Sequence, residues 1–201
     1  MIKAIILDFG GVVFQNKLKE KWDGEKDQLK VSPNLWEQAT LGKINDEKVF
    51  EDIAQNYNVS AREIKDWLFS RREPNQKLLD LLGTVKSDIK KAIINNGLKT
   101  LFRGFLTKYN LALKFDALIN SAEEGVKKPD PKIYLDTCQK LGVKPEECIF
   151  IDDDYDNIKG AADLGMKTIF FSNIQSLKDE FTKWGIENEA EPLLTNRLAK
   201  N

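Results

Sequence analysis

Five short apolar segments, most of them rich in β-branched residues, constrain the fold more than any other feature of this sequence. None of them alternates polar with apolar residues, so each predicts a strand buried on both faces, as in a parallel sheet covered by helices. Helical patterns separate most of the segments, and strands that alternate with helices predict an α/β protein with a doubly wound parallel sheet. The five segments are residues 4–7, 92–94, 117–119, 149–151 and 168–171. The helical patterns between and after them cover residues 98–109, 130–142 and 156–164.

Residues 16–76 interrupt this alternation. They contain no buried-strand pattern but have several typical helix starts, so they predict an all-helical insertion placed after the first strand. The rest of the chain, residues 1–15 and 77–201, is then one discontinuous core domain. The helix starts in the insertion are Ser32-Pro33, Asn45 and the capping box Ser60-Ala61-Arg62-Glu63.

The composition excludes several kinds of chemistry. The 201 residues include 31 Lys and Arg, 32 Asp and Glu, and no histidine. Without histidine there is no Ser-His-Asp or Cys-His nucleophile pair and no His-ligated zinc. The net charge of −1 lacks the basic surplus typical of nucleic-acid binding, so no nucleic-acid partner is expected. Nothing in the composition indicates an oligomeric state.

The cellular location follows from two weaker signals. The two cysteines, Cys138 and Cys148, form neither a disulfide framework nor a CxxC motif, which favours a reducing compartment. The apolar run that ends at Asp8 is too short for a membrane span or a signal sequence. We therefore expect a cytoplasmic protein without a membrane partner.

Four polar segments lie at or shortly after predicted strands, where open α/β sheets bind ligands. A carboxylate before a Gly-Gly turn is suited to be a nucleophile or metal ligand, and free amides at a strand end can hold an anion. A run of three acids favours a bound hard cation such as Mg²⁺. Taken singly, the segments also suit a turn aspartate, an Asn-Gly turn, surface lysines and an acidic helix start. The four are Asp8-Phe9-Gly10-Gly11, Asn95-Asn96-Gly97, Lys128-Pro129-Asp130-Pro131 and Asp152-Asp153-Asp154.

In this order the four segments resemble the motifs of the haloacid dehalogenase-like hydrolase superfamily. The resemblance covers about residues 1–15 and 77–175, and residues 16–76 resemble the small helical cap of its subfamily I. It implies a Rossmann-like sheet of strand order 5-4-1-2-3, in which Asp8 lies beside Asp152 and Asp153. The activity it implies is Mg²⁺-dependent hydrolysis of a small phosphorylated metabolite, with sugar phosphates as one candidate class.

The resemblance also implies a role for each matching residue. Asp8 is the nucleophile that forms an aspartyl-phosphate, and Lys128 neutralises the phosphoryl oxygens and restrains Asp8. Mg²⁺ is held by Asp8, the Gly10 carbonyl and the final acids, with Asp153 as the direct ligand and Asp152 as its neighbour. The expected phosphate-binding groups are the Asn95 side chain and the amides of Gly11, Asn96 and Gly97.

Two positions depart from the family pattern. Phosphatases of this type usually have a second Asp two residues after the nucleophile, as general acid and base, and Ser or Thr in the second motif. Here these positions are Gly10 and Asn95. Loss of a positioned general acid costs about 10²–10⁴ in rate. We therefore expect a substrate with a good leaving group, such as an anomeric sugar phosphate or an acyl phosphate.

Two other functions remain open from the sequence. A 2-haloacid dehalogenase shares the Asp nucleophile but needs no metal and has small neutral residues in place of Asp152 and Asp153. A degenerate member would bind a phosphorylated ligand without turnover. In the insertion, Arg71 and Arg72, or Trp36 and Gln38, are candidates to face the site, yet they are equally typical of surface and core positions.

Overall fold

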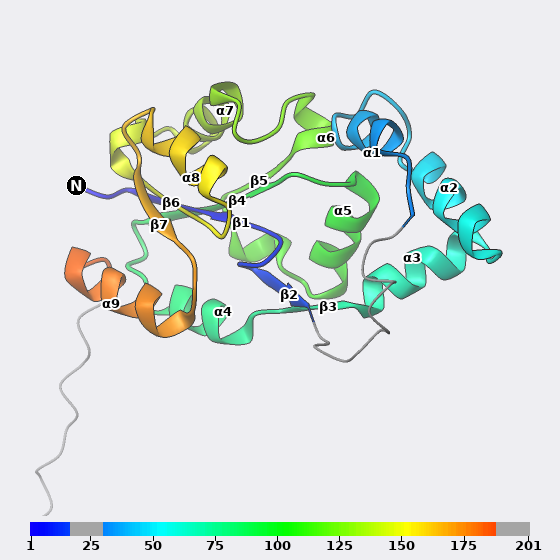
Figure 1. Cartoon of the computed structure of the whole chain (residues 1–201). Coiled ribbons are helices and arrows are strands. Elements are labelled where there is room, and N and C mark those ends of the chain that lie inside the picture. The colour runs from blue at the N-terminus through cyan, green and yellow to red at the C-terminus, as the bar shows by residue number, and fades with distance from the viewer. Residues whose placement is uncertain (17–29, 188–201) are drawn as a thin grey trace, which may run out of the picture.

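The computed structural model of the chain describes residues 1–16 and 30–187. These residues form a five-stranded sheet with helices on both faces, a two-stranded sheet, and three further helices at one side (Figure 1). Residues 17–29 of the expected insertion and 188–201 of the expected core domain lie outside the described residues.

All five apolar segments are strands of one parallel sheet, so the α/β prediction is confirmed. The sheet order is β5-β4-β1-β6-β7, with β1 at the centre. Strand β1 pairs on one side with β4, which ends at Asn95, and on the other side with β6, which ends at Asp152. The five strands are β1 (Ala4–Asp8), β4 (Lys90–Asn95), β5 (Ala117–Asn120), β6 (Cys148–Asp152) and β7 (Lys167–Phe170).

The expected order 5-4-1-2-3 differs from the order of these labels. The reason is that two strands absent from the prediction, β2 (Phe14–Asn16) and β3 (Arg72–Pro74), come between β1 and β4 along the chain. If the five strands of the main sheet are numbered first to fifth along the chain, the order from the β7 edge is fifth, fourth, first, second, third.

The two faces of β1 enter two different apolar clusters, which explains why its sequence does not alternate. Ile5 and Leu7 pack under α4, α5 and α9, whereas Ala4 and Ile6 pack under α7 and α8. Figure 1 shows these two helical layers on opposite sides of the sheet. The layers consist of α4 (Gln76–Gly83), α5 (Lys99–Lys108) and α9 (Ile174–Trp184), and of α7 (Pro131–Leu141) and α8 (Tyr155–Ala162). Shorter elements are α6 (Ser121–Glu124), η1 (Ala112–Lys114) and η2 (Pro145–Glu147).

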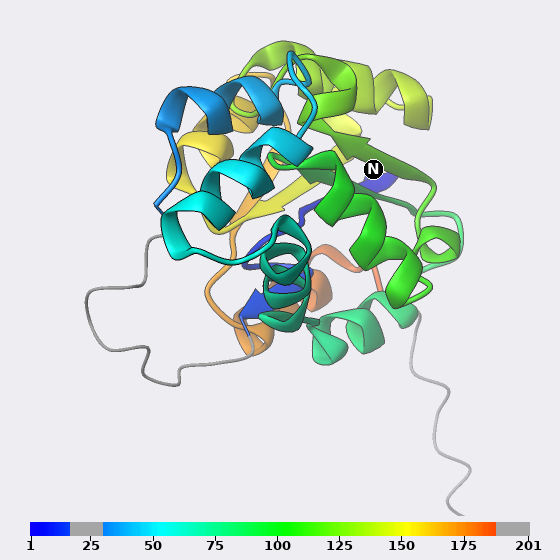
Figure 2. The ribbon, with the colours of Figure 1, turned by 90° about the vertical axis from the view of Figure 1, so that its right-hand side faces the viewer.

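Three helices of the insertion share a small apolar core of their own, built around Val49, Phe50 and Ile53. Leu98 joins this core from the loop before α5, so the insertion is packed against the main domain. Figure 2 shows the three helices beside α5. They are α1 (Pro33–Thr40), α2 (Glu47–Tyr57) and α3 (Ala61–Ser70).

The prediction that residues 16–76 are all helical is wrong at the ends of this segment. Asn16 belongs to β2, and Arg72–Pro74 forms β3, which pairs antiparallel with β2. Three residues are too few to show a strand periodicity, and Pro74 argues against a strand. The backbone pairing of two distant segments is what makes them a sheet. These strands bracket the insertion.

The fold brings the carboxyl ends of the parallel strands to the side where the insertion lies (Figure 1). All four polar segments identified from the sequence lie at or near this edge, because Asp8, Asn95 and Asp152 are the last residues of β1, β4 and β6. Within the described residues, no helix is long and apolar enough to cross a membrane.

Candidate active site

Asp8 is held in place by the buried strand β1 before it and by the tight turn after it. It is 8% exposed and follows four fully buried residues of β1. The chain then turns at once: the Phe14 amide donates to the Phe9 carbonyl at 2.7 Å, and Gly11 takes a φ of 90°. That φ favours glycine, and it keeps the turn short enough for the Asp8 carboxylate to remain at the strand end.

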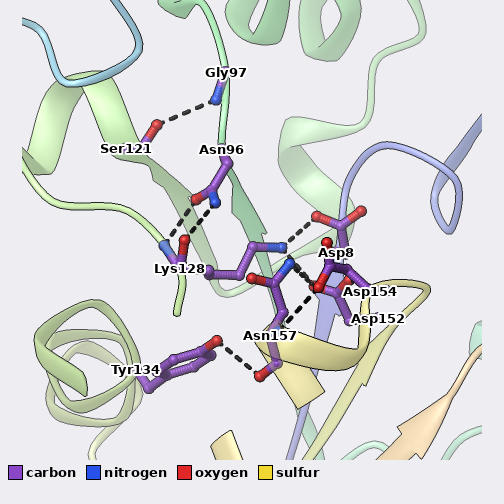
Figure 3. Close-up of polar contacts among 9 residues, drawn as sticks. All are labelled: Asp8, Asn96, Gly97, Ser121, Lys128, Tyr134, Asp152, Asp154 and Asn157. Carbon is purple, nitrogen blue, oxygen red and sulfur yellow. Dashed lines mark hydrogen bonds and ion pairs between the residues drawn. The ribbon is translucent and has the colours of Figure 1, made fainter. Parts of the chain in front are cut away.

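Lys128 is the buried counter-ion of this carboxylate. Its side chain is 1% exposed, and its ammonium group donates to Asp8 Oδ1 and, at 2.7 Å, to Asp152 Oδ2. Figure 3 shows the extended lysine side chain reaching the two carboxylates. The lysine backbone is held by Asn96, whose Oδ1 accepts from the Lys128 amide at 2.9 Å and whose Nδ2 donates to the Lys128 carbonyl at 2.8 Å.

The three acids at the end of β6 differ in their burial and their contacts. Asp152 is 1% exposed; besides Lys128, its oxygens accept from the Asp154 amide at 2.9 Å and from Asn157 Nδ2 at 3.1 Å. Asp153 is exposed, and its carboxylate lies against Gly11, where a Cβ atom would overlap it. Asp154 caps α8 by accepting from the Asp156 and Asn157 amides.

Asp8, Asp152 and Asp153 together form a group suited to a hard divalent cation. Each offers a carboxylate oxygen, and these oxygens lie within 4.8 Å of one another. Oxygen donors of this kind are the ligands that Mg²⁺ prefers, and Asp152 already uses hydrogen bonds to Lys128 and Asn157. Asp8 and Asp153 therefore have more capacity for direct ligation than Asp152 has.

The electrostatics also favour a bound cation. Burial raises the pKa of Asp8 to about 6; Lys128 opposes this rise, and Asp152 adds to it. Burial and the neighbouring Asp152 also raise the pKa of Asp153. Burial alone would lower the pKa of Lys128, but Asp8 and Asp152 outweigh it and the pKa is raised. Lys128 and the nearby Arg72 supply two positive charges against three carboxylates, so one negative charge remains that a bound cation would balance.

The expected phosphate-binding groups are not equally available. The Gly11 amide, after β1, donates to the Phe14 carbonyl at 2.7 Å, and the other three lie at the end of β4. Asn95 is 8% exposed at the strand end, and the Asn96 side chain is bonded to the Lys128 backbone. The Gly97 amide donates to Ser121 Oγ at 3.1 Å, so this N–H already has a partner (Figure 3). Ser121, which the sequence analysis did not identify, is fully buried and donates in turn to the Thr40 carbonyl of the insertion at 2.6 Å.

Arg72 is a second cationic group near Asp8. It lies on β3, and its Nη1 is 3.2 Å from the position that a Cβ atom on Gly10 would take. Burial lowers the pKa of Arg72, while Asp8 and Asp153 oppose the shift. The sequence named this arginine only as one of several candidates, because nothing local shows that β3 pairs with β2 and returns it to the site.

Comparisons with known proteins agree with this architecture. The family model of haloacid dehalogenase-like hydrolases matches residues 2–165. Among solved structures, the family enzyme BT-2542 from Bacteroides thetaiotaomicron, in complex with magnesium and inorganic phosphate, superposes with a TM-score of 0.70 and 23% identity. That match covers 86% of this chain and 95% of the other, and it shows a shared fold.

Three curated relatives have different activities in their names. Flavin mononucleotide hydrolase 1 from Arabidopsis thaliana is 28% identical over 77% of this chain, and the chain spans 63% of its length. A glyceraldehyde 3-phosphate phosphatase from Methanopyrus kandleri is 24% identical over 84% of this chain and 83% of its own. (S)-2-haloacid dehalogenase 1 from Pseudomonas sp. is 34% identical over 46% of this chain and 41% of its own. Several of the curated relatives are thus much longer than the chain.

Proposed function

The chain belongs to the haloacid dehalogenase-like hydrolase family, and from its site we propose that it is a Mg²⁺-dependent phosphatase of small phosphorylated metabolites. The observation that carries the proposal is the grouping of Asp8, Asp152 and Asp153 around buried Lys128. A carboxylate nucleophile beside a lysine and a cation site is suited to an incoming dianion, because positioning and charge neutralisation provide most of the catalysis of phosphoryl transfer.

In this proposal Asp8 attacks phosphorus and becomes an aspartyl-phosphate, which water then hydrolyses. Asp152 holds Lys128 in place, and Lys128 restrains the Asp8 carboxylate and neutralises phosphoryl oxygens. Asn95 and the Asn96 amide provide hydrogen-bond donors for the phosphate, while the Gly11 and Gly97 amides contribute only if their bonds to the Phe14 carbonyl and to Ser121 open.

Asp8, Asp153 and the Gly10 carbonyl are the groups that we propose to hold Mg²⁺, with Asp152 beside them. The cation would supply Lewis-acid charge neutralisation at the phosphoryl oxygens. The donor set supports this assignment, since it consists of oxygen ligands and no histidine is available for a softer metal.

The proposed substrates have good leaving groups. Gly10 offers no side chain to protonate a departing oxygen, and the sequence contains no histidine to replace one. Acyl phosphates and anomeric sugar phosphates need little protonation on departure, so they are the preferred classes. The names of two relatives, a flavin mononucleotide hydrolase and a glyceraldehyde 3-phosphate phosphatase, support a phosphorylated metabolite in general.

Dehalogenation is the second candidate, because a 94-residue segment is 34% identical to a 2-haloacid dehalogenase and Gly10 lacks the acid that phosphatases usually have. The buried Asp152 and the neighbouring Asp153 argue against it, since a repelling acidic group serves no purpose in a reaction that needs no cation. A non-catalytic binding protein is the third candidate.

A panel of phosphomonoesters and 2-haloacids, assayed with Mg²⁺ and with EDTA, tests the proposal. We expect phosphatase activity only with Mg²⁺, and a loss of roughly 10³-fold or more in Asp8→Asn because the nucleophile is removed. Asp179→Asn, an exposed acid on α9, is the matched control and should retain full activity. EDTA-resistant release of halide would support the dehalogenase instead. Phosphatase activity that Asp8→Asn leaves unchanged would rule out Asp8 as the nucleophile.

A further inference from the structure

Arg72 is positioned by backbone contacts to two separate parts of the main domain. In the two-stranded sheet it is the register partner of Asn16, close along the chain to the turn that follows Asp8. The Tyr109 hydroxyl donates to the Arg72 carbonyl at 3.4 Å from the end of α5. These contacts hold the base of the insertion against the core, so the arginine side chain starts from a defined place.

The guanidinium of Arg72 occupies the space next to Gly10. Its Nη1 and Cζ lie 3.2 and 3.9 Å from the position of a Cβ atom on Gly10. Gly10 is two residues beyond the nucleophile, and its lack of a side chain is what lets the guanidinium come this close to the turn after β1. The glycine and the arginine are thus complementary in shape.

The guanidinium of Arg72 is not paired with a carboxylate in the part of the chain that the structure describes. Among residues 1–16 and 30–187, no carboxylate forms an ion pair with Arg72, although Asp8 and Asp153 are near enough to shift its pKa. Lys128 is the opposite case, because two carboxylates accept from its ammonium group. A guanidinium has up to five N–H donors, and in this half-buried group none of them is used by a side chain of the described residues.

We propose that Arg72 is a catalytic residue that donates hydrogen bonds to the leaving-group oxygen of the substrate. The inference rests on the proposed phosphatase function and on the in-line geometry of phosphoryl transfer, which places the leaving oxygen opposite Asp8. The carboxyl end of β1 faces the side where the insertion lies, and Arg72 lies on β3 at the end of that insertion (Figure 1).

The step balances without a proton donor in the protein. The bond from Asp8 to phosphorus forms as the bond from phosphorus to the leaving oxygen breaks, and the electron pair stays on that oxygen. Arg72 stabilises the resulting anion by charge-assisted hydrogen bonds but keeps its own protons, because a guanidinium is not an acid near neutral pH. The anion takes a proton from solvent only after it leaves.

This role narrows the substrate class. Hydrogen bonding without proton transfer suffices for leaving groups that are stable anions, such as the carboxylate of an acyl phosphate or the oxygen of an activated sugar or aryl phosphate. Simple alkyl phosphates should be hydrolysed much more slowly, because their alkoxides need a proton to depart and hydrogen bonds stabilise them only in part.

The dependence of rate on leaving group tests the role directly. With Mg²⁺ present, kcat/KM is measured for 4-nitrophenyl, phenyl and benzyl phosphate, in order of poorer leaving groups. We expect Arg72→Met to reduce kcat/KM by roughly 10²-fold or more for phenyl and benzyl phosphate but only a few fold for 4-nitrophenyl phosphate, because the donor matters most where most negative charge develops. Arg72→Lys should restore part of the loss, since it keeps the charge without the planar fork.

Arg71→Met is the matched control, because the neighbouring Arg71 lies over the Trp67 ring, with its Cζ 5.0 Å from the ring centroid. Arg71→Met should leave unchanged the dependence of kcat/KM on the acidity of the leaving group. An equal loss for all three esters in Arg72→Met, with an unchanged melting temperature, would place Arg72 on the phosphoryl oxygens and overturn the inference while the proposed function stands. A wild-type protein that hydrolyses none of the esters would instead refute the proposed function itself.

Discussion

Asp152 and Asp153 are adjacent carboxylates that take different roles because only one of them is buried. Asp152 directs both oxygens at donors of the protein, namely Lys128, Asn157 and the Asp154 amide. Asp153 lies at the surface against Gly11. Burial and the negative charge of Asp152 raise its pKa, and a bound cation would relieve the repulsion between the two carboxylates. The first carboxylate therefore positions the lysine, and the second is the better placed to bind a cation.

Gly11→Ala tests how tightly Asp153 is placed. A Cβ atom at residue 11 would overlap the Asp153 carboxylate and would also sit at a φ of 90°. We expect Mg²⁺ affinity, measured by calorimetry, to fall about 10–100-fold, which is typical when the support of a metal ligand is disturbed.

Gly185→Ala separates the two effects of that change. Gly185 has a φ of 60°, but a Cβ atom there meets nothing within 4 Å. Both variants should lose about 1–2 kcal/mol of stability from the strained backbone, and only Gly11→Ala should lose Mg²⁺ affinity. Equal Mg²⁺ affinities in the two variants would contradict this account of Asp153.

Helix α5 begins with a cap that another part of the chain provides. Its own N-cap residue, Leu98, has no polar side chain, yet the amide of Thr100 needs an acceptor. Asp46 of the insertion supplies it: Oδ2 accepts from the Thr100 amide at 2.7 Å and Oδ1 from the Thr100 hydroxyl at 2.9 Å. The same carboxylate thus caps α5 and attaches the insertion to the main domain.

Asp46→Ala should therefore destabilise the protein by about 1–2 kcal/mol, since a largely buried helix cap and its hydrogen bonds are lost together. Urea denaturation measures the change. Thr100→Val removes the hydroxyl bond but keeps the capped amide, so its cost should be clearly smaller. Comparable losses in the two variants would show that the hydroxyl, and not the helix cap, carries the interaction.

As one folded unit, the chain concentrates three acids at the centre of a sheet edge, with the Lys128 ammonium and the Arg72 guanidinium as their counter-charges. The resulting repulsion weakens the folded state, and a cation bound there would be linked to the stability of the whole fold. Metal binding is for this reason measurable without any substrate.

Mg²⁺ at about one hundred times its Kd should stabilise the folded state by about 2.7 kcal/mol. For a chain of this length that corresponds to a rise in melting temperature of roughly 5–10 °C, which differential scanning fluorimetry detects. EDTA should reverse the rise.

Asp153→Asn removes a proposed ligand and one repelling charge at once. We expect the variant without Mg²⁺ to melt at the same temperature as the wild type or higher, and to show little further rise when Mg²⁺ is added. Asp179→Asn should respond to Mg²⁺ like the wild type. A full Mg²⁺ response in Asp153→Asn would exclude Asp153 as a direct ligand.

Local patterns were sufficient to predict the parallel sheet and the grouping of acids at its edge. Five short, mostly apolar segments separated by helical patterns favour a sheet covered on both faces, and the carboxyl ends of parallel strands meet at one edge. The prediction that Asp8 lies near Lys128, Asp152 and Asp153 followed from that rule together with the family resemblance, and their contacts confirm it.

Long-range pairing was not predictable in the same way. The strands β2 and β3 have three residues each, and their partners are far apart along the chain. The bond from the Gly97 amide to Ser121 and the approach of Arg72 to Gly10 also join distant segments. None of these contacts leaves a periodic or compositional signal.

The amino-acid sequence by itself therefore determined the layered α/β architecture and the grouping of acids at the edge of the sheet, because burial and strand polarity are encoded residue by residue. The tertiary structure decided which donors of the site are already engaged, how the insertion is attached through Asp46, and that Arg72 reaches the turn after Asp8. These outcomes depend on which surfaces meet when distant segments pack. The free energy of that packing depends on both segments together, so neither segment's own sequence reveals it.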